Sequence, residues 1–178
     1  MQARAALMIE HRLTERMLSV INRALKRVEQ KQAIDSFFVD LAVDFIRTYA
    51  DRAHHGKEEE ILFRKLESRN LSNADRQVMN ELIEEHAFGR KITKALVDAN
   101  LQNRNGNGSA LASVTAQLRT LVEYYPKHIE KEDNVFFPAS RSYMTDDEDQ
   151  TMLAEFIEFD RKMIHEKYNA IVRSLEHD

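Results

Sequence analysis

The stretch His54-His55-Gly56-Lys57-Glu58-Glu59-Glu60-Ile61-Leu62-Phe63 recurs 74 residues later as His128-Ile129-Glu130-Lys131-Glu132-Asp133-Asn134-Val135-Phe136-Phe137. Both copies follow the pattern H-x-x-K-E-[ED]-x-[IV]-x-F. In each copy a His precedes a Glu by four residues, which places the two side chains one turn apart on the same helix face. Imidazole nitrogen and carboxylate oxygen together suit a first-row transition metal. Two such pairs therefore indicate a repeated half-site.

A further histidine precedes each copy at nearly the same distance. His11 lies 43 residues before His54, and His86 lies 42 residues before His128; a Glu comes directly before each leading His. Each half thus predicts one helix with an inward His, followed by a helix with an inward His and Glu. Four such helices would form a ligand cage in a bundle core.

Burying these six donors without partners would cost several kcal/mol for each charge, which metal coordination offsets. The repeat therefore predicts a buried metal site. The alternative is a structural role in which Glu58 and Glu132 form ion pairs with Lys57 and Lys131.

The composition favours long helices and excludes several classes of site. The chain has 178 residues with 43% hydrophobic and 31% charged residues, but only four Gly and two Pro, too few for the turns of an all-β fold. The absence of cysteine excludes disulfides, zinc ribbons and Cys-ligated iron–sulfur clusters. A net charge of -4 gives no electrostatic case for nucleic acid. No apolar run approaches the roughly 18 residues of a membrane helix, and no signal-type segment opens the chain. We therefore expect a cytoplasmic protein without a membrane partner.

Hydrophobic periodicity predicts an all-α fold, an up-down four-helix bundle with an additional C-terminal helix. The expected helices span about 4–30, 33–66, 73–101, 109–134 and 146–175. We interpret residues 1–178 as a single domain, with the bundle over about 4–138. Ser72 with Asp75, and Thr145 with Glu148, resemble capping boxes at the starts of two of these helices.

Three positions should disturb the helices. Phe45 and His54 are nine residues apart and fall on opposite faces of a regular helix, so the helix is either apolar on two sides or distorted before His54; we expect one helix with a broad apolar surface. Pro126 should kink the axis next to His128, and Pro138 should end that segment. Gly56 could permit the close approach of another backbone.

The donor set narrows the choice of metal. Six donors exceed the four that a zinc ion usually takes, and four imidazoles argue against calcium and magnesium, which prefer oxygen. Two iron ions, or iron with manganese, suit mixed imidazole and carboxylate ligands. Zinc stays a possible occupant.

The arrangement H…H-x-x-x-E…H…H-x-x-x-E resembles the hemerythrin-like (HHE) four-helix bundle domain over roughly Met8–Pro138. The resemblance implies a non-haem di-iron centre bridged by Glu58 and Glu132. The ligands that it implies are His11, His54, Glu58, His86, His128 and Glu132. One departure is Arg64, which stands where the first motif often has Pro.

A second departure concerns the histidine count. Oxygen-carrying members of the family use five histidines, and the repeat fixes only four. We expect His165 of the C-terminal helix as the fifth metal ligand, if that helix leans across the mouth of the bundle; otherwise it supports a ligand or lies at the surface. His55 is turned 100° from His54 on a regular helix, so it is interpreted as a flanking residue together with Glu59 and Glu60.

The resemblance implies a protein that binds or responds to O2, NO or peroxide. One alternative is a di-iron oxidoreductase that consumes peroxide or NO, and another is a non-catalytic module whose stability depends on iron. The sequence leaves open whether the chain is an enzyme and which of these ligands it meets.

Overall fold

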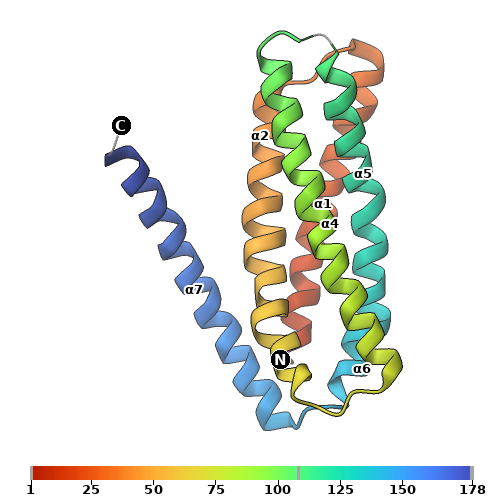
Figure 1. Ribbon diagram of the computed structural model, residues 1–178, viewed down its shortest axis with the longest axis vertical. Helices are drawn as coiled ribbons and strands as arrows, with labels where there is room; N and C mark the ends of the chain where they lie inside the picture. Colours follow the sequence, from red (N-terminus) through yellow and green to blue (C-terminus); the bar gives the residue numbers. More distant parts are fainter. Residues whose placement is uncertain (1, 108, 177–178) are drawn as a thin grey trace.

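The computed structural model describes residues 2–107 and 109–176, and its regular elements within these ranges are all helices (Figure 1). The α-helices are α1 Ala3–Lys31, α2 Ser36–Phe45, α3 Arg64–Glu67, α4 Asn73–Arg104, α5 Ala110–Lys131, α6 Phe137–Arg141 and α7 Asp146–Glu176. Three π-helical segments, in which backbone hydrogen bonds span five residues, are η1 Ile46–His55, η2 Glu58–Phe63 and η3 Glu132–Phe136. The predicted all-α fold is confirmed.

Four helical columns lie side by side and form the bundle (Figure 1). They are α1, then α2–η1–η2–α3, then α4, then α5–η3–α6. Short connections join them, so that consecutive columns run antiparallel, as expected for an up-down bundle. The last helix, α7, starts at the same end as α6 and leans outward from the bundle (Figure 1).

The bundle core consists of two apolar layers with a polar belt between them. One layer, nearer the α4–α5 loop, includes Leu18 of α1 and Leu96 of α4. The other layer includes Leu7 of α1 and Leu82 of α4. His11 and His86 lie between these positions along their helices, and both are buried. The belt of buried histidines and glutamates is thus closed by apolar side chains on both sides.

Side-chain hydrogen bonds fix the starts of two long helices. The backbone N–H of Asp75 donates to Ser72 Oγ at 3.1 Å, and the N–H of Thr145 donates to Glu148 Oε2 at 2.8 Å. Both predicted capping boxes are therefore confirmed. The start of α7 is also anchored to α1, because the buried guanidinium of Arg4 pairs with the buried carboxylate of Asp149.

The second column is distorted before His54. Ile46–His55 is a π-helix, so the side chains there do not follow the 100° step of an α-helix. Phe45 and His54 would fall on opposite faces of a regular helix, and two explanations were considered. The distorted helix is correct, and the expected regular helix with a broad apolar surface is wrong.

Gly56 and Pro138 differ in part from expectation, whereas Pro126 lies inside a helix as predicted. Gly56 is approached by a side chain of α7, since a Cβ at this position would lie 2.7 Å from Phe159 Cζ. Helix α5 continues through Pro126. Pro138 lies in the first turn of α6, directly after the π-helix η3, and the column continues to Arg141 instead of ending at Pro138.

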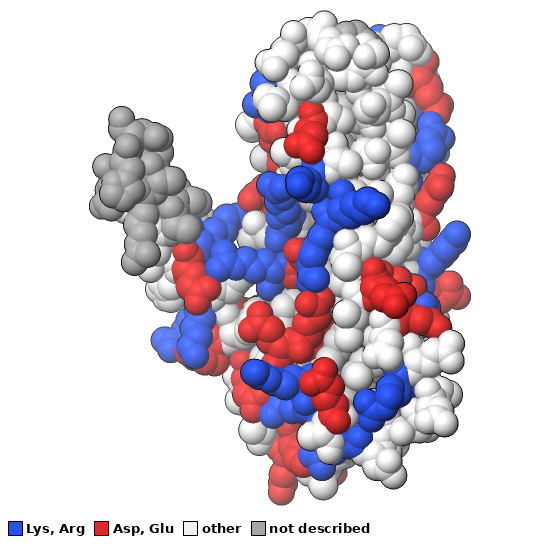
Figure 2. Space-filling view, viewed as in Figure 1, with Lys and Arg blue, Asp and Glu red and all other residues white. Residues whose placement is uncertain are grey.

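Positive and negative side chains are interspersed over the face shown in Figure 2, including the region where α7 meets the bundle. Ion pairs tie α7 to the second column, among them the following two. Arg52 pairs with Glu166 at 2.8 Å, and Lys167 pairs with Asp44 at 2.9 Å. In the described part of the chain, no helix combines the length and the apolar character needed to cross a membrane.

Candidate metal centre

Seven buried side chains converge in the polar belt from all four columns. They are His11 of α1, His54 and His55 of η1, Glu58 of η2, His86 of α4, His128 of α5 and Glu132 of η3. Each is at most 3% exposed, and the two glutamates are fully buried. The belt thus contains five histidines, whereas the sequence repeat predicts four.

One group of donors joins the first half of the chain to Glu132. The Nε2 atoms of His11 and His54 lie 2.8 Å apart, and His11 Nε2 lies 3.1 Å from Glu132 Oε2. Glu58 completes this group, with its Oε1 3.6 Å from His54 Nε2. Ligand atoms that share one ion at about 2.0–2.2 Å lie roughly 3 Å apart, so this spacing suits a single cation.

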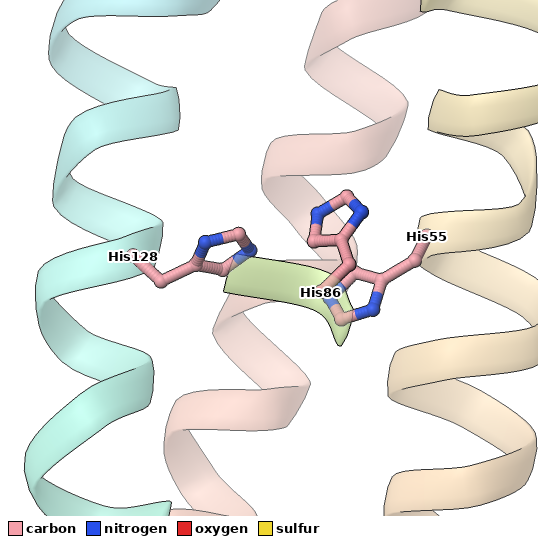
Figure 3. A group of neighbouring side chains, drawn as sticks. All are labelled: His55, His86 and His128. Atoms are coloured by element: carbon pink, nitrogen blue, oxygen red, sulfur yellow. The ribbon is translucent and has the colours of Figure 1, made fainter. Parts of the chain in front are cut away.

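A second group contains three histidines from three columns, His55, His86 and His128 (Figure 3). Their rings point toward one another, and one ligand atom from each lies within 4.8 Å of the others. His128 Nε2 lies 3.2 Å from Glu132 Oε1, and His86 Nε2 lies 3.4 Å from Glu58 Oε2. The two glutamates therefore also face this second group.

Each of the two glutamates divides its oxygens between the groups. Glu58 directs Oε1 toward His54 and Oε2 toward His86. Glu132 directs Oε2 toward His11 and Oε1 toward His128. A carboxylate with one oxygen toward each of two cation positions can bridge them.

The five rings are oriented by carboxylates on their outer side. The Nδ1 atoms of His54 and His128 each lie 2.8 Å from Glu10 Oε2 and Glu85 Oε2, respectively. These are the two glutamates that precede the leading histidines in sequence, so the repeat in sequence is also a repeat in contacts. An acceptor at Nδ1 fixes the proton on that nitrogen and leaves Nε2 free to bind a metal.

The remaining rings follow the same rule. His11 Nδ1 lies 2.7 Å from Asp133 Oδ1, and His86 Nδ1 lies 2.6 Å from Glu59 Oε1. Asp133 and Glu59 are equivalent residues of the repeated pattern. The weakest of these contacts belongs to His55, whose Nδ1 lies 3.4 Å from an oxygen of Asp51.

Lysine side chains form ion pairs with some of these outer carboxylates. Lys57 pairs with Glu10 and lies 2.9 Å from Asp160 of α7, while Lys131 lies 2.5 Å from Glu85. The predicted alternative, in which the two lysines neutralise Glu58 and Glu132, is therefore wrong. The lysines hold the carboxylates that orient the histidines.

Arg90 forms ion pairs with the carboxylates that lie behind two other histidines. Its Nε lies 2.8 Å from Asp51 Oδ1, and its Nη2 lies 2.7 Å from Glu59 Oε1. One guanidinium therefore holds the carboxylates behind both His55 and His86.

Burial shifts the pKa values of the central groups toward their neutral forms. Desolvation lowers the pKa of His54 and His55 well below 6.5, and it lowers the pKa of His128 to about 4. It raises the pKa of Glu58 and Glu132 well above 4.5. Neutral imidazoles are the form that binds a metal, whereas the raised pKa of the two carboxyls expresses the cost of ionising them without a cation nearby.

The outer carboxyl Glu85 shows the opposite shift. Burial alone would raise its pKa, but hydrogen bonds from His128 and Lys131 outweigh that effect and lower the pKa to about 2. Glu85 is therefore a permanent anion beside His128 Nδ1.

Several donor atoms at the centre make no hydrogen bond within the described part of the chain. Both carboxylate oxygens of Glu58 and of Glu132, and the Nε2 atoms of His86 and His128, are buried without a hydrogen bond among the described residues. Such atoms normally have partners, because an unpaired buried polar group costs free energy. Nitrogen and oxygen donors that converge in this way fit a transition-metal cation.

The structure brings together the six residues that the repeat singles out and adds His55, which sequence reasoning placed on the flank. Glu59 was also assigned to the flank but holds His86. His165 lies apart from both groups and is exposed on α7, so it does not supply the fifth histidine of the belt. The adjacent pair His54-His55 was the available signal, and both residues lie in the π-helix Ile46–His55 and are buried.

Comparisons with known proteins agree with this geometry. The curated relatives include the uncharacterized proteins Mb2018 of Mycobacterium bovis and Rv1995 of Mycobacterium tuberculosis, each 23% identical over 150 residues, which is 84% of this chain. The chain spans 58% of the length of these relatives. No solved structure matches it. The sequence model of the hemerythrin HHE cation-binding domain matches residues 2–140, so the chain belongs to the hemerythrin HHE cation-binding domain family.

Proposed function

We propose that this chain holds a non-haem di-iron centre and binds or responds to a small diatomic or peroxidic ligand, O2, NO or H2O2. The observation that carries the proposal is the position of Glu58 and Glu132, each with one oxygen toward each of the two histidine groups. This arrangement supports two cations that share carboxylates over a single cation.

The donor count argues against a single zinc ion. Five imidazoles and two carboxylates exceed the four ligands of a usual zinc site. Mixed nitrogen and oxygen donors suit iron, or iron with manganese. When bound, a pair of iron ions supplies exchangeable coordination positions and redox chemistry toward O2, NO or peroxide. The chain's own residues orient the imidazoles, keep water out and hold the carboxylates in place.

Reconstitution of the metal-free protein with Fe(II) under anaerobic conditions tests the proposal. We expect two irons per chain by metal analysis, and new absorption bands after exposure to O2, NO or H2O2. A single zinc per chain together with no oxygen-to-iron charge-transfer band would overturn it. The Glu60→Gln variant is the matched control, because Glu60 is exposed in the same motif and should leave the stoichiometry unchanged.

An iron-responsive module without catalysis is the second candidate. It is favoured by the buried oxygens of Glu58 and Glu132, which make no hydrogen bond among the described residues and would be stabilised by a cation. Melting curves with and without metal test it, and equal stability would exclude it.

A di-iron oxidoreductase is the third candidate function. Measuring turnover distinguishes it from a binding protein. Consumption of many equivalents of H2O2 or NO per chain, with a reductant supplied, would favour an enzyme. Uptake limited to one ligand per centre would favour a binding protein. The cytoplasmic location expected from the sequence remains part of the proposal.

A further inference from the structure

A chain of contacts leads from the metal centre to α7. His54 Nδ1 lies 2.8 Å from Glu10 Oε2, and the other oxygen of Glu10 pairs with Lys57. Lys57 Nζ in turn lies 2.9 Å from Asp160 Oδ2. Asp160 belongs to α7, which lies outside the four columns of the bundle (Figure 1). A helix outside the bundle therefore places a negative charge three contacts away from a candidate metal ligand.

The equivalent contacts in the other half of the repeat end differently. Glu85 lies at His128 Nδ1 and pairs with Lys131. The next carboxylate is Glu81, 3.1 Å from Lys131 Nζ, and it lies on α4 together with Glu85. The side chain of Lys131 is 28% exposed, whereas that of Lys57 is 2% exposed. Water can therefore partly replace Glu81 at Lys131, but it has almost no access to Lys57.

The contact with α7 coincides with two departures of the first motif copy from the second. Phe159 approaches Gly56, where a Cβ would lie 2.7 Å from Phe159 Cζ, and the next residue, Asp160, contacts Lys57. The second copy has Glu130 in place of Gly56, and Glu130 is exposed. A glycine and a buried lysine thus stand in the copy of the motif that α7 covers.

The charge of Asp160 bears on His54 through the groups between them. Burying the ammonium group of Lys57 costs free energy unless ionised acceptors surround it, and Glu10 and Asp160 share that role. Without the Asp160 charge, Glu10 would interact more strongly with Lys57 and would accept the N–H of His54 less well. The imidazole would then be a poorer donor to a cation. The local charge would also be more positive by one unit, which acts against a bound cation as well.

We propose that Asp160 is a positioning residue through which α7 strengthens metal binding at the side of the centre formed by His11 and His54. It acts through Lys57 and Glu10. The corresponding contacts in the second half of the repeat end on α4, so the two metal positions differ in their dependence on α7. This inference rests on the proposed function, because it requires a cation at each of the two positions.

Iron affinity and Mössbauer spectra of the iron-loaded full chain test the proposal. Asp160→Asn removes the charge and keeps the size of the side chain. We expect it to weaken the binding of one of the two irons about tenfold, the lower end of the range for residues that support a ligand. The Mössbauer signal of that iron should change, while the signal of the other iron stays as in the parent protein. Asp160→Glu restores the charge and should restore the affinity and the signal.

Glu81→Gln is the matched control, because Glu81 pairs with the equivalent lysine of the other half. We expect it to leave the iron signal that Asp160→Asn alters as it is in the parent protein. Its effect on affinity should be smaller than that of Asp160→Asn, because Lys131 is partly solvated.

NMR spectra of the metal-free full chain give a readout that does not need iron. In Asp160→Asn we expect the Nδ1 proton of His54 to move upfield, because its hydrogen bond to Glu10 weakens. The Nδ1 proton of His128 should keep its position, since its partner Glu85 is held by α4 and α5 alone.

The outcomes separate the inference from the proposed function. Parental iron affinity together with a parental His54 signal in Asp160→Asn would overturn the inference and leave the di-iron centre standing. Equal changes at both irons, with no rescue by Asp160→Glu, would also overturn it, because that pattern shows that Asp160 only holds α7 in place. Failure of the parent protein to take up two irons would overturn the proposed function, and the inference with it.

Discussion

His55 stacks face to face on His86, with ring centroids 3.8 Å apart and ring planes 8° apart. The two rings come from different columns, η1 and α4. The contact fixes the orientation of His55 even though its hydrogen bond to Asp51 is the longest among the five histidines. His55 is therefore positioned by packing more than by a charged partner.

Replacement of His55 by Ala should remove one donor from the second group and weaken metal binding. We expect a loss larger than the about 10–100-fold that removal of a residue supporting a ligand causes. His165→Ala is the control, because His165 is exposed outside both groups. Competition of each variant with a chelator measures the affinities. Loss of metal in His165→Ala, with full retention in His55→Ala, would restore the assignment made from the sequence.

The carboxylates behind the histidines should matter equally in the two halves. Glu10→Gln and Glu85→Gln each remove the negative charge at the Nδ1 atom of an equivalent histidine. We expect each change to weaken metal binding about 10–100-fold and to shift the metal spectrum in the same direction. An affinity unchanged by both substitutions would mean that the outer carboxylates serve the fold alone.

Metal binding should strengthen as pH rises from about 5 to about 8. The pKa of His54 and His55 is lowered by burial, so the unfolded chain takes up protons below about pH 6.5 that the folded chain refuses, and stability falls with falling pH. The pKa of Glu58 and Glu132 is raised, so the folded chain without metal favours their protonated forms. The folding stability that these protonated carboxyls contribute is lost as pH rises above about 4.5.

A cation removes the second of these effects because it stabilises the ionised carboxylates. The difference in Tm between metal-loaded and metal-free protein should therefore grow over this pH range. Thermal unfolding of both forms at several pH values measures it. A difference that is constant with pH would contradict the assignment of these buried groups as ligands.

Gly56 should report how tightly α7 lies on the bundle. In an otherwise regular helix, Gly→Ala stabilises by about 1 kcal/mol. A Cβ at Gly56 would overlap Phe159 Cζ, so this gain should shrink or reverse in the parent protein. In a Phe159→Ala background the full gain should return. Urea unfolding of the four proteins gives the coupling, and the same effect of Gly56→Ala in both backgrounds would show that the contact has no energetic weight.

Much of the fold followed from the sequence, because its helices carry clear apolar stripes and scarce glycine. The two copies of the motif fixed the position of the central donors, since the same spacing occurs twice. Helix ends differed by a few residues, as at Lys31 and Arg104. The end placed at Pro138 was wrong, because the column passes from the π-helix η3 into α6 and continues to Arg141.

His55 was not predicted as a ligand because a regular α-helix was expected through His54 and His55. On an α-helix His55 turns 100° from His54, but both residues lie in the π-helix Ile46–His55, where side chains do not follow that step, and both are buried in the belt. Phe45 and His54 fall on opposite faces of a regular helix although both are expected to face the core, and this disagreement indicated the distortion. His165 was assigned to the site on the expectation that its helix leans across the bundle, but Ile164 beside it is 51% exposed and this part of α7 leaves the core.

The belt between the two apolar layers also sets how the columns align. Sliding one column by a single turn, about 5.4 Å, would move a histidine or glutamate against leucine and phenylalanine side chains. Each charge misplaced in this way would cost several kcal/mol. Apolar stripes alone tolerate such slippage, whereas donors at one level in four columns do not. The metal-binding residues thereby fix the axial alignment of the four columns. A substitution there is expected to alter helix alignment as well as metal affinity.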